Sequence, residues 1–182
     1  MDWFRTVSLW AATITIGLVA GVFVLYAHTI MPGLARTDDR TFVAAFQEID
    51  RMIINPWFIG GCFFGAVVCT VLAVVTQVGR SALPWIVAAL VLYLVTVGIT
   101  LTVNVPRNDA IKAAGLPESA TELAAIRARF DEVGWRSWNI VRVIASTFAF
   151  GLLSWALVVH GRSSGAALPN GSARRRAVGP GS

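Results

Sequence analysis

The sequence predicts an all-α transmembrane four-helix bundle. Four apolar runs contain no Asp, Glu, Lys, Arg or His: residues 6–27, 55–79, 81–106 and 143–159. A helix needs about 20 residues to cross the roughly 30 Å hydrocarbon core of a bilayer, and each run supplies about that length. The composition agrees, since 56% of residues are hydrophobic and 14% are charged, against roughly 25% charged in soluble domains. A soluble protein with four buried helices would need a coat of polar helices that this chain lacks.

The four spans are expected at residues 7–27, 57–76, 84–103 and 140–159, in one membrane domain over 1–161. The first span is expected to be retained, because its apolar run is longer than that of a signal peptide and no small-x-small cleavage site follows. We expect Met31-Pro32-Gly33 to stop the first span and Asn104-Val105-Pro106-Arg107-Asn108-Asp109 to break the third.

The two longer connections are expected to carry amphipathic helices. In the first, Asp38 and Asp39 precede apolar residues that recur at helical spacing, namely Phe42, Phe46, Ile49 and Ile53. Such a helix is expected to lie along the outer membrane surface. In the second, the apolar stripe consists of Leu123, Ile126, Phe130 and Val133.

Charge suggests an orientation in the cell membrane. If the spans alternate, both termini and the turn at Arg80 share one side. The charges of that side sum to +5, whereas those of the two long connections sum to zero. The positive-inside rule counts Lys and Arg near span ends, so we expect both termini in the cytoplasm. The remainder of the chain, residues 162–182, is expected to be a disordered basic tail.

Several function classes are disfavoured. The few basic residues make nucleic-acid binding a poor interpretation, and no phosphate-binding loop or dinucleotide fingerprint occurs. No cluster of His, Cys and carboxylates has metal-ligand spacing. A haem held by two histidines is excluded because His28 and His160 end opposite sides of the bundle. Cys62 and Cys69 lie about 10 Å apart along one helix, too far for a disulfide. We therefore expect no cofactor and no metal.

Polar residues gather at one membrane level, where all four spans deliver hydrogen-bonding groups. The candidate site residues there are His28, Asn55, Asn104, Asn108, Trp135, Trp138, Asn139 and Arg142. The last four follow i, i+3, i+4, i+7 spacing and therefore share a helix face. An arginine near a span end either extends outward to the interface or faces an internal polar pocket. Asn104 and Asn139 would be its neighbours in such a pocket.

Other interpretations of these residues stay open. The tryptophans also fit an aromatic belt at the membrane interface, and His28 could be merely interfacial rather than a general base. Two small-xxx-small pairs, Gly17/Gly21 and Gly61/Gly65, allow close helix approach, either inside the bundle or in a homodimer.

Four blocks together resemble the anthrone oxygenase-like family, which comprises small four-span membrane proteins. They are Met31-Pro32-Gly33-Leu34, Phe42-x-x-x-Phe46-x-x-x-Asp50-Arg51-x-x-x-Asn55-Pro56-x-Phe58, Asn104-Val105-Pro106-x-Asn108-Asp109 and Trp135-x-x-Trp138-Asn139-x-x-Arg142. The resemblance covers about residues 7–160. Asp50 departs from it, because such proteins are expected to carry Asn there, and a ligand contact at that position would imply a different substrate.

The resemblance implies a reaction. Characterised fungal relatives are cofactor-free oxygenases that convert an anthrone to an anthraquinone with O2, although most bacterial members have no assigned activity. Such a site needs a base, oxyanion donors and an apolar slot. His28 would be the base and Trp135 and Trp138 would flank the ring. The oxyanion would be stabilised by Asn104, Asn108 and Arg142.

The alternative is a non-enzymatic membrane protein that binds a lipid or a quinone, or an accessory subunit of a membrane complex. The polar level suits either function, because a pocket for a flat lipophilic aromatic need not react with it. The lack of ionisable residues deep in the spans argues against an ion-coupled transporter.

Overall fold

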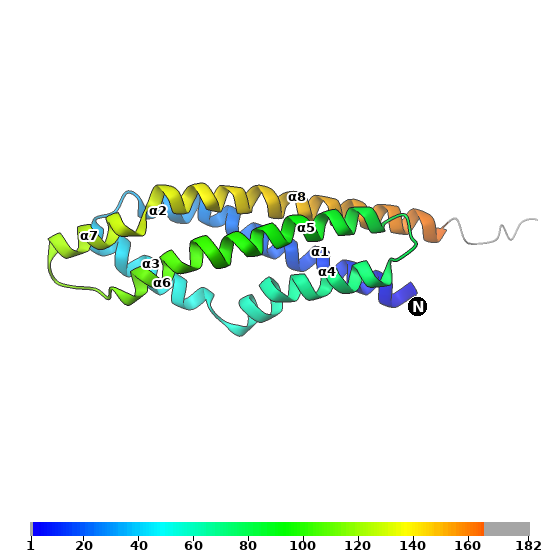
Figure 1. Cartoon of the computed structure of the whole chain (residues 1–182), viewed down its shortest axis with the longest axis horizontal. Coiled ribbons are helices and arrows are strands. Elements are labelled where there is room, and N and C mark those ends of the chain that lie inside the picture. Colours follow the sequence, from blue (N-terminus) through cyan, green and yellow to red (C-terminus); the bar gives the residue numbers. More distant parts are fainter. Residues whose placement is uncertain (1, 166–182) are drawn as a thin grey trace, which may run out of the picture.

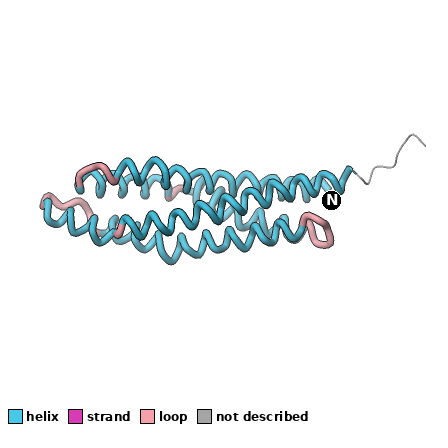
Figure 2. Tube along the Cα trace, turned by 90° about the horizontal axis from the view of Figure 1, so that it is seen from above, coloured by secondary structure: helices cyan, strands magenta, loops and turns pink. Residues whose placement is uncertain are grey.

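The computed structural model describes residues 2–165 and places four long helices side by side (Figure 1). Each is long and apolar enough to cross a membrane: Trp3–Leu34, Pro56–Thr76, Leu83–Ala113 and Ala120–Ser163. The described residues form helices and no strand. The longer loops lie at the two ends of the bundle, and a short one at residues 54–55 lies part-way along it (Figure 2). The prediction of a four-helix membrane bundle is confirmed.

Each long helix is built from shorter segments, which the labels of Figure 1 follow. The first helix comprises α1 (Asp2–Leu25), the π-helical turn η1 (Tyr26–Ile30) and α2 (Met31–Leu34). The second comprises the π-helical segment η2 (Pro56–Phe64) and α4 (Gly65–Thr76). The third comprises α5 (Leu83–Ile99), the π-helical turn η3 (Thr100–Asn104) and α6 (Val105–Ala113). The fourth comprises α7 (Ala120–Phe130) and α8 (Glu132–Gly165), while α3 (Asp39–Ile53) joins the first two.

Two expected helix stops do not stop their helices. The first helix continues through Pro32 to Leu34, and the third continues through Pro106 to Ala113. Each proline stands in the first turn of its α-segment, directly after a π-helical turn. Proline lacks an N–H and its ring clashes with the carbonyl four residues earlier. The extra residue in a π-helical turn makes room for the ring, so the helix passes the proline instead of ending there.

Two hydrophobic cores stabilise the molecule. The larger fills the space between α1, α4, α5 and α8 with small and aliphatic side chains, for example Ala12, Ile16, Ala89 and Leu153. The smaller lies under α3, where Phe46 packs 4.5 Å from Phe130 and 5.9 Å from Trp135 between ring centroids. The apolar face of α3 thus packs against protein, not against the membrane surface as expected, because α7 and α8 offer it the aromatic rings of Phe130 and Trp135.

Caps and one arginine fix α3 in place. Asp38 accepts hydrogen bonds from the backbone N–H of Thr41 at 2.9 Å and from its hydroxyl at 2.8 Å, which caps α3 and lowers the pKa of the Asp38 carboxyl. Arg127 of α7 donates to Asp39 at 3.0 Å and to the carbonyl oxygen of Thr37 at 2.9 Å. These contacts hold the start of α3 against α7.

The N-terminus, the α4–α5 connection and the end of α8 lie at one end of the bundle (Figure 1). α8 continues to Gly165, past Arg162, where we expected the tail to begin. The rest of the predicted tail, residues 166–182, lies outside the described residues. The second end is formed by α2, α3, α6 and α7, and the candidate site lies beside α3 and α6, among the four long helices (Figure 1).

Candidate functional site

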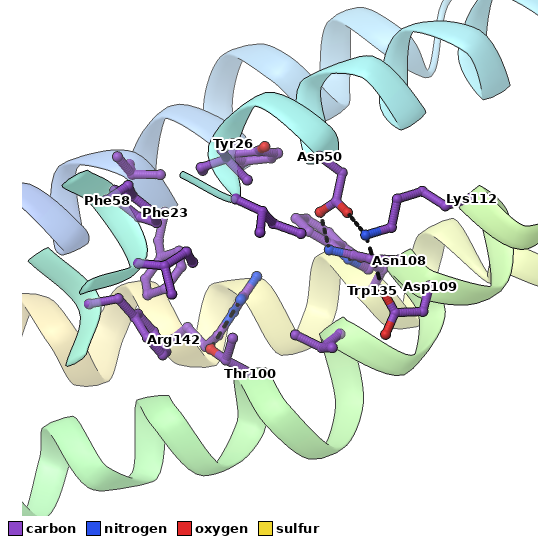
Figure 3. Close-up of a pocket in the computed structure, with 16 residues that line it drawn as sticks. Phe23, Tyr26, Asp50, Phe58, Thr100, Asn108, Asp109, Lys112, Trp135 and Arg142 are labelled. Carbon is purple, nitrogen blue, oxygen red and sulfur yellow. Dashed lines mark hydrogen bonds and ion pairs between the residues drawn. The ribbon is translucent and has the colours of Figure 1, made fainter. Parts of the chain in front are cut away.

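A cavity of about 100 Å³ lies in the half of the bundle farther from the N-terminus (Figure 3). Its lining is mainly apolar and comes from every long helix and from α3. The polar and charged members are Tyr26, Asp50, Thr100, Asn108, Asp109, Lys112 and Arg142. Among the apolar members, Ile54 is 55% exposed and therefore marks a mouth of the cavity.

All three π-helical segments contribute to this cavity. Tyr26 comes from η1, Phe58, Ile59 and Phe63 from η2, and Thr100 from η3. Asn55 caps η2, because its Oδ1 accepts a hydrogen bond from the backbone N–H of Phe58 at 2.9 Å. π-Helical turns redirect side chains within a helix and are frequent at functional sites. Here three helices contain such a segment at the level of the cavity.

Arg142 of α8 points into the cavity and is only 4% exposed. Its guanidinium donates to the Oδ1 of Asn139 at 2.8 Å and to the hydroxyl of Thr100 at 3.2 Å. Two rings flank it, with centroids 4.4 Å (Phe23) and 5.3 Å (Trp135) from its Cζ. The Nε of Arg142 has no hydrogen-bond partner among the described residues. Arginine is rarely buried without a charged partner, so this side chain is the most unusual group of the site.

Asp50 of α3 forms a second polar centre on the cavity wall (Figure 3). Its carboxylate accepts a hydrogen bond from the Nδ2 of Asn108 at 2.7 Å and pairs with the Nζ of Lys112 at 2.7 Å. Lys112 also pairs with Asp109 at 3.1 Å, and Asp109 reaches solvent. The indole N–H of Trp135 donates to the Oδ1 of Asn108 at 2.8 Å. One chain of contacts therefore connects α3, α6 and α8.

Backbone geometry positions Trp135 and Arg142. Asp131 adopts a left-handed conformation at φ 54° and separates α7 from α8. Its carboxylate accepts a hydrogen bond from the backbone N–H of Gly134 at 3.1 Å, and a Cβ at Gly134 would lie 2.0 Å from that carboxylate. A side chain at position 134 would therefore displace the Asp131 carboxylate from this hydrogen bond at the start of α8.

The structure brings some of the predicted site residues together. Asn108, Trp135 and Arg142 line the cavity. Asn104 and Asn139 are buried behind it, where Asn104 donates to the carbonyl oxygen of Trp135 at 3.4 Å and Asn139 donates to that of Phe23 at 3.1 Å.

The other predicted residues do not line the cavity. Asn55 acts as a helix cap, as described. Trp138 is 43% exposed. His28 is exposed and contacts the hydroxyl of its neighbour Thr29 at 2.6 Å. The cavity therefore offers a carboxylate where the sequence suggested a histidine, and the predicted roles of His28 and Trp138 remain predictions.

Sequence reasoning missed Tyr26, Thr100, Lys112 and the contribution of Asp50. One signal was available, because Asp50 lies four residues after Phe46 and eight after Phe42 and therefore shares their buried face. Asn108 and Lys112 likewise stand four residues apart on one face of α6.

Within residues 2–165, no group of three or more His, Cys, Asp and Glu side chains is arranged to hold a metal ion. Fold and site together define a membrane-spanning four-helix bundle with one polar, aromatic-lined cavity.

Comparison with known proteins assigns the family. The family model described as Anthrone oxygenase matches residues 55–152, more than half of the chain, so the chain belongs to the anthrone oxygenase family. No curated protein and no solved structure matches it. The matched residues include Asn108, Trp135 and Arg142, whereas Tyr26 and Asp50 precede them.

Proposed function

We propose that this protein is a cofactor-free oxygenase that oxidises a lipophilic aromatic carbon acid with O2 in the cavity described above. Family membership supports the reaction class. The observation that carries the proposal is that Asp50 and Arg142, a carboxylate and a guanidinium, line the same aromatic cavity. An apolar mouth at Ile54 suits a substrate that arrives dissolved in lipid.

The reaction needs a base within reach of an acidic C–H bond. In an anthrone, the CH2 group between two aromatic rings is acidic because its carbanion is delocalised onto the carbonyl oxygen as an enolate. Asp50 is our proposed base in place of His28, because Asp50 lines the cavity and His28 does not. A carboxylate has about four lone-pair sites. Asp50 can therefore accept a proton while it keeps its hydrogen bond from Asn108 and its ion pair with Lys112.

The remaining steps balance without metal or flavin. The carbanion carbon forms a bond to O2, so that carbon is oxidised and O2 is reduced to a peroxide, which takes up a proton. Removal of the second C–H proton then forms the new C=O bond and breaks the O–O bond. The outer oxygen leaves as hydroxide and takes up a proton to give water. Anthrone and O2 thereby give anthraquinone and one water. Arg142, held between the rings of Trp135 and Phe23, stabilises the enolate oxygen.

Oxygen uptake by purified protein tests this proposal. With an anthrone as substrate, we expect uptake above the spontaneous rate in the same detergent, with anthraquinone formed in equal amount. Asp50→Asn is nearly isosteric and should lower the catalysed rate by about 100-fold or more, since general-base catalysis contributes about 10²–10⁴.

Glu48→Gln is the matched control. Glu48 lies two residues before Asp50 on the exposed side of α3, paired with Arg51, so its variant should keep the wild-type rate. Equal rates for Asp50→Asn and wild type would refute the base assignment. No uptake by wild-type protein that copurifies with a quinone or a lipid would refute the oxygenase proposal and favour the binding function.

A further inference from the structure

Arg142 is a buried cation without a counter-ion. It forms no ion pair with any carboxylate of residues 2–165, and both of its hydrogen-bond acceptors, Asn139 and Thr100, are neutral. A buried charge is normally paired, because leaving it alone in a low-dielectric interior is strongly unfavourable. Within a membrane bundle a charge is likewise costly, and an intramembrane ionisable residue is by default a candidate functional group.

None of the other charged groups of the cavity forms an ion pair with Arg142. Asp50 is neutralised by Lys112 at 2.7 Å, and Lys112 also contacts Asp109, whose side chain is 63% exposed. Tyr26 is the remaining titratable group of the lining, and its phenol is neutral in its ordinary state. The four charges of the lining sum to zero, but both carboxylates lie on Lys112, so the guanidinium of Arg142 has no negative charge of the lining in contact with it.

The guanidinium is also held rigidly. The Oδ1 of Asn139 accepts a hydrogen bond from Arg142. The Nδ2 of Asn139 donates a hydrogen bond to the carbonyl oxygen of Phe23, which fixes the Asn139 side chain. The rings of Phe23 and Trp135 flank the guanidinium. The Nε–H, which has no partner, remains available for an acceptor. A fixed donor beside aromatic walls matches a flat, anionic, oxygen-bearing ligand.

We propose that the cavity binds its ligand in the ground state as an anion, namely the phenolate or enolate of a lipophilic aromatic acid, with its oxygen on Arg142. This inference rests on the proposed function for its ligand class and extends it, because ionisation occurs on binding and does not require O2. The bound anion supplies the counter-ion that the bundle itself lacks.

A hydroxyanthraquinone dye such as alizarin tests the inference, because its absorption reports whether the phenol is ionised and the quinone is already oxidised. The dye is titrated with pH under nitrogen, with wild-type protein or with empty detergent micelles. We expect the pKa of the bound dye to lie at least one unit below its value in micelles. At a pH between the two values, this means about tenfold more phenolate relative to phenol.

Two variants of α8 test whether the shift of the dye pKa depends on Arg142. Arg142→Gln keeps a hydrogen-bonding side chain and should abolish the shift. Arg136→Gln removes a half-exposed arginine of the same helix that pairs with Glu132 and should preserve it. Melting temperatures of all three proteins establish that each is folded.

Several results would overturn the inference. These are failure of the dye to bind wild-type protein, an unchanged dye pKa, and a shift that survives in Arg142→Gln. Displacement of the dye by oleate at lower concentration than the dye would also overturn it, because the ligand would then be a lipid carboxylate. A shift of the dye pKa without oxygen uptake on an anthrone would retain this inference and reject only the oxygenase proposal. Oxygen uptake without a shift of the dye pKa would retain the oxygenase proposal and reject this inference.

Discussion

The two halves of the bundle differ in how closely their helices pack. In the half that holds the N-terminus, regular α-helices pack through fully buried small residues such as Ala12, Ala73 and Ala156. Polar groups there meet one another, as when the Nε2 of Gln77 lies 2.9 Å from the Nδ1 of His160. In the other half, three helices contain π-helical segments, and a cavity replaces close packing.

We interpret this difference as a division between residues that stabilise the fold and residues that would bind the proposed ligand. Small residues stabilise the first half because they let helices approach closely, which is the main source of association in lipid. The second half leaves the guanidinium of Arg142 without an anion and leaves space unfilled. Functional sites often depart from the most stable arrangement in this way.

The largest stability effect is expected in the closely packed half. Ala149 of α8 is fully buried in the larger core. Ala149→Leu inserts three carbons where no space exists, so we expect a loss of about 1–3 kcal/mol. Thermal unfolding in detergent measures it, and Phe148→Leu on the adjacent, 66% exposed position is the control.

Activity per folded molecule should stay at the wild-type value in Ala149→Leu, because this residue does not line the cavity. A loss of oxygen uptake that exceeds the loss of folded protein would mean that packing in the first half controls the cavity in the second half.

A smaller effect is expected at the cap of α3. Hydrogen bonds from Thr41 hold the pKa of Asp38 below its ordinary value of 3.8. Such a group stabilises the fold above that value, and its contribution is lost as the pH falls below it. Asp38→Ala should therefore lower the melting temperature at pH 7, by less than Ala149→Leu does.

The difference between Asp38→Ala and wild type should shrink as the medium becomes more acidic than the ordinary Asp pKa. A gap that stays constant with pH would show that Asp38 contributes only its backbone conformation and not its charge.

The sequence was sufficient for the spans and for part of the site. Long uncharged runs specify transmembrane helices because the bilayer admits few alternatives. Arg142 and Trp135 were predicted from helical spacing, and the structure places both on the cavity wall. Trp138 shows the limit of that spacing, since three residues turn a helix by about 300° and leave its ring about 60° from that of Trp135. Asn139 and Arg142 lie four and seven residues after Trp135, and at these separations a helix returns closer to the direction of Trp135.

The missed features depend on tertiary packing. Prolines 32 and 106 normally indicate helix ends, and nothing in the local sequence shows that a π-helical turn will precede them. Asp50 lies on an amphipathic helix, where a charged residue usually faces water. It faces inward here because Asn108 and Lys112 of α6 meet it, a contact between positions 58 and 62 residues apart.

The central claim is that Arg142 binds a ligand and does not stabilise the folded state. Arg142→Met tests it most directly, with oxygen uptake on an anthrone and the melting temperature measured on one preparation. Replacing an unpaired buried charge by an apolar side chain of similar length is often neutral or stabilising. We therefore predict that uptake falls to the spontaneous rate while the melting temperature stays at or above that of wild type. A melting temperature that falls as far as that of Ala149→Leu would contradict the claim and make Arg142 a structural residue.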